Sequence, residues 1–144
     1  MEVRRVALAW TTLVVCAGLL PAVVADDTLC EPSPDSERHA SLSRETAACG
    51  TDAACLDRAN ARWQAVLGRD MRVYARYVRA FAADSARAER ALRQRRDASP
   101  KDPFLVTAHG LALPADSEEQ AAAYAAALSL DPSFPWAHFY LAQR

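Results

Sequence analysis

The side chains best suited to covalent or metal chemistry are four cysteines and three histidines. They are Cys16, Cys30, Cys49, Cys55, His39, His109 and His138. A zinc site needs about four ligands at close spacing, and only His39 lies near the cysteines in the sequence. No neighbouring base is evident that would activate a cysteine as a nucleophile. The spacing therefore predicts no metal site and no catalytic cysteine, which leaves disulfide formation as the chemistry to consider.

Disulfides depend on the compartment, and residues 1–25 have the pattern of a cleaved secretory signal peptide. Arg4 and Arg5 precede an apolar run over residues 6–20, Pro21 ends that run, and small residues lead to Ala25. A membrane-spanning helix needs about 20 apolar residues, more than this run provides. We therefore expect cleavage after Ala25 and no membrane span in the mature chain. The alternative is an uncleaved leader that anchors the chain.

Cleavage removes one cysteine and leaves three, namely Cys30, Cys49 and Cys55. On one continuous helix Cys49 and Cys55 would lie about 9 Å apart, too far for a disulfide. Gly50 suits the left-handed residue after a helix, and Thr51 or Asp52 suits the cap of the next helix. A turn there favours a Cys49–Cys55 disulfide at the corner of a helical hairpin. In the alternative pairing, Cys30 bonds to one of these two cysteines.

The composition favours helices and argues against a nucleic-acid partner. The net charge is −1, and removal of Glu2, Arg4 and Arg5 with the leader leaves about −2, without the basic surplus that binds phosphates. Alanine supplies 32 of 144 residues and glycine only four, so the material for strands is scarce. Enrichment in alanine and arginine is typical of a GC-rich bacterium, which makes the periplasm the expected location, with secretion as the alternative.

Helix signals divide the mature chain into segments. Residues 26–35 contain Pro32 and Pro34 and are expected to be extended or disordered. Residues 36–99 contain no proline and are expected to form a helical region. Its expected helices cover residues 36–49, 55–67, 71–81 and 85–97. Asp70 and Asp84 are expected to cap the last two.

Large apolar side chains recur at helical spacing in this region. Met71, Tyr74, Val78 and Phe81 mark one face of the third predicted helix. Aromatic residues at such spacing usually form the core, and we expect this of Trp63, Tyr74, Tyr77 and Phe81. The fourth predicted helix is rich in arginine, which suggests either a surface for an acidic peptide or a solvated face. Because acidic residues interrupt the arginines, we expect a solvated face.

The second half of the chain carries a periodic pattern. Asp102-Pro103 and Asp131-Pro132 are 29 residues apart, and each precedes an Ala-His pair. Such a period indicates a helical array. A helix over residues 117–130 is expected between them, with a capping box from Ser117 to Gln120. Equivalent histidines in adjacent repeats would lie about 10 Å apart, too far to share one metal ion.

Residues 101–144 combine small residues, an aromatic residue, a proline turn and a following helix, at Ala123, Tyr124, Ala127, Leu128, Pro132, Trp136 and Leu141. With these residues this stretch resembles a tetratricopeptide repeat. The resemblance implies an all-α fold in which antiparallel helical hairpins stack as a short solenoid. It also implies a concave surface that binds a peptide or another protein.

The sequence lacks the motifs of common enzymes. We find no glycine-rich phosphate loop, no Gly-x-Ser-x-Gly and no His-Glu-x-x-His. We therefore expect an exported, non-enzymatic interaction module without a cofactor. Its partner is an unidentified protein or peptide, and the C-terminal helix is a candidate surface for self-association. The alternatives are a small disulfide-clipped envelope inhibitor or stress protein, and the N-terminal part of a longer protein whose activity lies beyond residue 144.

Overall fold

A computed structural model describes residues 34–144 as seven α-helices and one 3-10 turn, with no strand in that range. The helices are α1 (Pro34–Ala48), α2 (Ala53–Val66), α3 (Met71–Ala80), α4 (Ser85–Ala98), α5 (Pro103–Gly110), α6 (Glu118–Leu130) and α7 (Pro135–Ala142), and the turn is η2 (Ala82–Asp84). None of these helices is long and apolar enough to cross a membrane. The predicted all-α fold is confirmed. The predicted signal peptide and Cys30 lie outside the described residues.

Side-chain caps explain where most of the helices begin. The carboxylates of Asp52, Asp70, Asp84 and Asp102 each accept a hydrogen bond from a backbone N–H in the first turn of the next helix. The Ser117 hydroxyl accepts from Gln120 N in the same way at α6. These bonds satisfy donors that a helix start leaves without a partner. One boundary was predicted wrongly: α1 begins at Pro34, because proline is well tolerated in the first turn of a helix.

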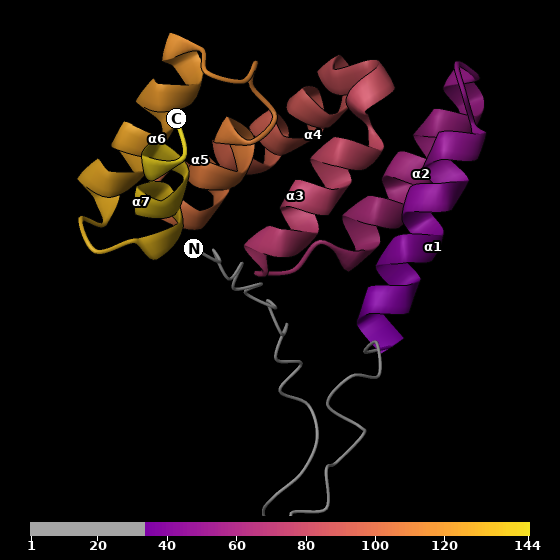
Figure 1. Cartoon of the computed structure of the whole chain (residues 1–144), viewed down its shortest axis with the longest axis horizontal. Helices are drawn as coiled ribbons and strands as arrows, with labels where there is room; N and C mark the ends of the chain where they lie inside the picture. Colours follow the sequence, from indigo (N-terminus) through magenta and orange to yellow (C-terminus); the bar gives the residue numbers. More distant parts are fainter. Residues whose placement is uncertain (1–33) are drawn as a thin grey trace, which may run out of the picture. The chain divides into compact units, whose positions relative to one another are not determined.

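Consecutive helices form hairpins, and the odd-numbered helices lie next to one another. The structure pairs α1 with α2, α3 with α4, and α5 with α6. In addition α1 packs on α3, α3 on α5, and α5 on α7. Figure 1 shows the same succession, with α1 at one end and α6 and α7 at the other. The odd-numbered helices therefore make one continuous layer, and α2, α4 and α6 cover it.

The main core is built from the aromatic residues that the sequence predicts. Trp63, Tyr74, Tyr77 and Phe81 are all at most 1% exposed. The Trp63 indole N–H donates to the Thr46 hydroxyl over 3.1 Å, and the Tyr77 hydroxyl lies 2.7 Å from Asn60 Oδ1. The buried polar ends of both rings are therefore satisfied, as burial requires. Tyr77, and not the half-buried Val78, lies at the centre of the buried face of α3.

The arginine-rich helix α4 departs from the solvated face that was expected. Arg95 is half-buried and donates to the Gln64 side chain, the Gln64 carbonyl and the Tyr74 hydroxyl. Arg87 is also largely buried and pairs with Asp84 and Asp57. These two side chains join α4 to α2 and α3, because a guanidinium carries five donors in a fixed plane. Only the exposed members of the series, such as Arg90 and Arg93, match the expectation.

A close approach between α5 and α6 organises the C-terminal part. A Cβ atom placed on Gly110 would lie 2.6 Å from the Tyr124 ring and 3.3 Å from Ala123 Cβ. The Tyr124 ring cannot easily withdraw, because it is 2% exposed and stacks on Tyr140 with 5.6 Å between ring centroids. The contact therefore requires a residue without a side chain at position 110.

We predict that Gly110→Ala destabilises the fold by about 2 kcal/mol, because the added methyl group overpacks a rigid site. Thermal and urea unfolding followed by circular dichroism measure this. Gly68→Ala is the matched control, since a Cβ at Gly68 meets nothing within 4 Å. Equal stability of the two variants would contradict the packing described for Tyr124.

An ion pair ties the segment before α3 to the start of α5. Arg69 donates twice to the Asp102 carboxylate, over 2.8 and 3.2 Å, and lies 5.0 Å from the Phe104 ring centroid. The hydrogen bond from Arg69 lowers the pKa of Asp102, and it outweighs the partial burial that raises this pKa. The same carboxylate caps α5, so one residue sets both the helix start and the contact between hairpins.

We predict that the Arg69–Asp102 pair makes stability depend on pH. A depressed folded-state pKa stabilises the protein above the unfolded value, about 3.9, and this contribution disappears as the pH falls through the folded-state pKa. Asp102→Asn keeps the cap and removes the ion pair. The stability difference from the unmodified chain should be largest near neutral pH and shrink as the pH falls through the lowered folded-state pKa of Asp102. Urea unfolding at several pH values measures it, and a constant difference would contradict the linkage.

Candidate functional site

A groove between α1 and α3 is a candidate site in the described part of the chain. Its volume is about 600 Å³, and its lining residues are Ser36, Ala40, Ser43, Arg44, Ala47, Arg76, Arg79 and Ala80. This volume falls in the range of about 300–1,000 Å³ that is common for ligand sites. The floor is made mainly of small side chains, and three arginines lie along it.

The sequence of α1 explains the shape of this groove. Ser36, Ala40, Ser43 and Ala47 recur at steps of three or four residues, so they share one face of the helix. The larger buried side chains of α1, such as Leu42, lie on another face, in contact with α2. Short side chains on the first face let another chain come close to the α1 backbone.

The three groove arginines have no carboxylate partner in the described part of the chain. Arg44, Arg76 and Arg79 form no salt bridge within residues 34–144, and no acidic residue lines the groove. Six other arginines are paired with carboxylates, namely Arg62, Arg69, Arg72, Arg87, Arg93 and Arg96. The groove therefore holds three guanidinium groups that no carboxylate of residues 34–144 pairs with directly.

The acidic residue of a neighbouring hollow, Asp70, is already engaged. Asp70 and Arg72 line a smaller hollow that shares Ser36 and Arg76 with the groove. The hydrogen bond from Arg72 lowers the pKa of Asp70, against the effect of burial, and the charge of Arg76 adds to the lowering. Both Asp70 oxygens bond to Arg72. Asp70 is therefore ionised and bonded near neutral pH, and Arg76 has no direct carboxylate partner there.

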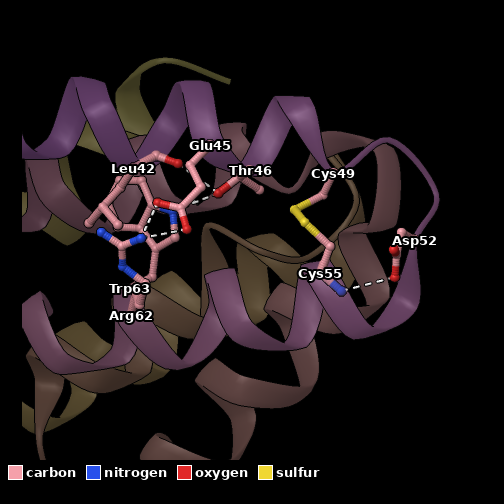
Figure 2. Close-up of a disulfide and its surroundings, with 8 residues drawn as sticks. All are labelled: Leu42, Glu45, Thr46, Cys49, Asp52, Cys55, Arg62 and Trp63. Atoms are coloured by element: carbon pink, nitrogen blue, oxygen red, sulfur yellow. Dashed lines mark hydrogen bonds and ion pairs between the residues drawn. A yellow bond between two sulfur atoms is a disulfide. The ribbon is translucent and has the colours of Figure 1, made fainter.

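The wall of the groove formed by α1 is fixed to α2 by a disulfide. Cys49 and Cys55 are bonded, with their Cα atoms 5.4 Å apart, which is the pairing favoured from the sequence. Gly50 has a φ of 54°, the left-handed conformation expected at this turn, and Asp52 accepts a hydrogen bond from Cys55 N. Figure 2 shows the disulfide at the hairpin corner.

Further along the hairpin, polar contacts also hold α1 against α2. Figure 2 shows Arg62 paired with Glu45, and Trp63 next to Thr46. The Thr46 hydroxyl in turn donates to the Leu42 carbonyl over 2.8 Å. The position of α1, and so the width of the groove, depends on this set of contacts to α2.

We predict that reducing the Cys49–Cys55 disulfide lowers the free energy of unfolding by about 2 kcal/mol, because the bridge closes a short loop of the unfolded chain. Thermal unfolding with and without dithiothreitol, in a Cys30→Ser background, measures this. The control is the Cys49→Ala/Cys55→Ala variant in the same background, which should not respond to the reductant. Unchanged unfolding of the parent on reduction would contradict a structural role for the bridge.

The histidines take part in separate local networks. His109 Nδ1 lies 3.1 Å from Arg96 and Nε2 lies 3.0 Å from Glu89. A guanidinium can only donate, so Nδ1 accepts from Arg96 and Nε2 donates to the Glu89 carboxylate. His138 Nε2 lies 2.8 Å from the Pro132 carbonyl. Within residues 34–144 no group of three His, Cys, Asp or Glu side chains could hold a metal ion.

The predicted repeat-packing residues gather where α5, α6 and α7 meet. Tyr124 and Ala127 are buried, together with Val106 and Ala137 in one cluster. Partly buried members of the predicted set are Ala123, Leu128, Trp136 and Leu141, and Pro132 is exposed. Tyr140 stacks between Tyr124 and Trp136, and Phe139 is 48% exposed.

Sequence reasoning did not identify the groove. Arg44 lies 32 residues before Arg76, and only the packing of α1 on α3 brings the two together. The small residues spaced along α1 were the available signal, because they indicate a face that a neighbour can approach closely. No family model, curated protein sequence or solved structure matches this chain, so its geometry is the basis for a functional proposal.

Proposed function

We propose that this protein is an exported helical-repeat module that binds an acidic peptide segment of a partner protein. The proposal rests on one observation, the groove between α1 and α3 with three arginines that lack carboxylate partners within residues 34–144. Guanidinium groups bind carboxylates through paired hydrogen bonds, so Arg44, Arg76 and Arg79 would each receive an aspartate or glutamate of the partner.

The dimensions of the groove favour a short extended segment. The small residues of α1 run from Ser36 to Ala47, which corresponds to about 16 Å along a helix. An extended chain covers about 3.3 Å per residue, so about five residues fit this length. Arg76 and Arg79 are three residues apart on α3 and are therefore neighbours on its surface. Acidic side chains at alternate positions of an extended peptide would reach both.

A peptide suits this groove better than a nucleic acid. The chain as a whole carries a net charge of −1, and six arginines of residues 34–144 are paired with its own carboxylates, so the chain lacks the basic surplus that binds a phosphate backbone. The alanines of the floor offer apolar contact, and they leave room for a peptide backbone. This combination matches a few carboxylates carried on a chain that also has apolar atoms.

The stacking of the hairpins supports the wider description as a repeat module. Successive odd-numbered helices pack side by side, as the tetratricopeptide resemblance of residues 101–144 implies for a short solenoid. In such an array the surface of one helix layer is continuous and can hold an extended ligand. Export to the periplasm, proposed from the leader sequence, would place the Cys49–Cys55 bridge where disulfides persist.

Fluorescence anisotropy with a labelled peptide of alternating glutamate and serine, five residues long, tests this proposal. We predict saturable binding that weakens about tenfold for each reversed charge in Arg44→Glu and Arg79→Glu, a loss of about 1.4 kcal/mol each. Binding should also weaken when the salt concentration rises from about 50 to 500 mM, because ions screen exposed charges.

The matched control is Arg58→Glu, which reverses an arginine on α2 that is exposed and has no salt bridge within residues 34–144. This variant should bind the peptide as the unmodified chain does, and a peptide with glutamine in place of glutamate should not bind. Equal weakening by Arg58→Glu and Arg79→Glu would show that net charge, and not the groove, attracts the peptide.

A further inference from the structure

A second hollow, mostly apolar, lies next to the groove. Its volume is about 670 Å³, and it lies among the end of α3, η2, the start of α4 and the segment that follows α5. The apolar side chains of its lining come from two places in the sequence. Val78 and Ala82 lie on one side, and Leu111, Leu113 and Pro114 on the other.

Arg79 joins this apolar hollow to the groove, because its side chain lines both. The Arg79 Nε donates to the Ala75 carbonyl over 3.3 Å, and the guanidinium forms no ion pair within residues 34–144. A peptide whose carboxylate binds Arg79 therefore has its neighbouring residues at the edge of the apolar hollow. The two cavities are adjacent parts of one surface.

The apolar hollow, unlike the groove, has an acidic residue in its lining. Glu89 lines it together with Arg79. Burial raises the pKa of Glu89, but hydrogen bonds from His109 and Arg93 lower it by more. The pKa of Glu89 therefore lies below its usual value. Glu89 is therefore ionised near neutral pH, and both its oxygens are engaged, by His109 at 3.0 Å and by Arg93 at 2.6 Å. An acidic side chain would be repelled there, whereas an aliphatic one would find Val78 and Leu113.

From this arrangement we infer that the peptide carries a large aliphatic residue next to its acidic run, and that this residue binds in the hollow bounded by Val78, Leu111 and Leu113. The inference rests on the proposed function and adds the partner's sequence class: alternating acidic residues followed within about two positions by leucine, isoleucine or methionine, since Arg79 borders both cavities. Burial of such a side chain supplies affinity that exposed ion pairs alone do not.

Two labelled peptides that differ in one residue test this inference on the full chain. Both carry the alternating acidic run, and one ends in leucine and the other in serine. We expect the leucine peptide to bind about tenfold more tightly, in keeping with partial burial of one aliphatic side chain. In Ala86→Trp the new indole would fill the hollow from the exposed surface of α4. The leucine and serine peptides should then bind this variant with equal affinity, and the serine peptide should bind it as tightly as it binds the unmodified chain.

Ala83→Trp is the matched control, because Ala83 is equally exposed but does not line the hollow. It should leave the leucine preference intact, and Arg44→Glu should weaken both peptides by the same factor. If both peptides bind the unmodified chain with equal affinity, the inference is wrong and the proposed function stands. If neither binds, the proposed function itself fails.

Discussion

The architecture depends on a row of aromatic rings that joins the first two hairpins. His39 of α1 stacks on Trp63 of α2 with 6.0 Å between centroids, Trp63 contacts Tyr77 of α3 at 5.8 Å, and Tyr77 contacts Phe81 at 5.2 Å. A second contact, between Tyr74 and Phe104 at 5.2 Å, continues from α3 to α5. Buried aromatic pairs contribute both apolar area and a preferred geometry. This row sets the spacing of the odd-numbered helices, and the groove lies between two of them.

The chain has few large apolar side chains, and hydrogen bonds between its polar side chains add to the contacts between helices. Thr46, Asn60 and Gln64 satisfy the buried ends of Trp63 and Tyr77 and the guanidinium of Arg95. Polar networks of this kind fix one arrangement of helices when every member has a partner. The three groove arginines, in contrast, form no ion pair within residues 34–144. Three such cations along one groove are the feature from which the proposed binding role follows.

Local signals in the sequence predicted much of the fold, and long-range packing decided the rest. Asp70, Asp84 and Ser117 cap helices as predicted, because capping depends on residues within one turn. Arg95 was assigned to a solvated face, since the periodicity of one helix does not reveal the neighbour that covers it. The groove was missed for a similar reason. Arg44 and Arg79 meet only through the packing of α1 on α3, and no pattern within either helix specifies that neighbour.

The most direct test of a binding role for the α1–α3 groove is a nitrogen-15 NMR titration of the protein with an acidic peptide. The account predicts that amide shifts concentrate in α1 and α3, at residues such as Ser43, Ala47 and Ala80, and that the exposed face of α6 at Ala125 stays unchanged. Shifts centred on α6 and α7, or no shifts at saturating peptide, would contradict it.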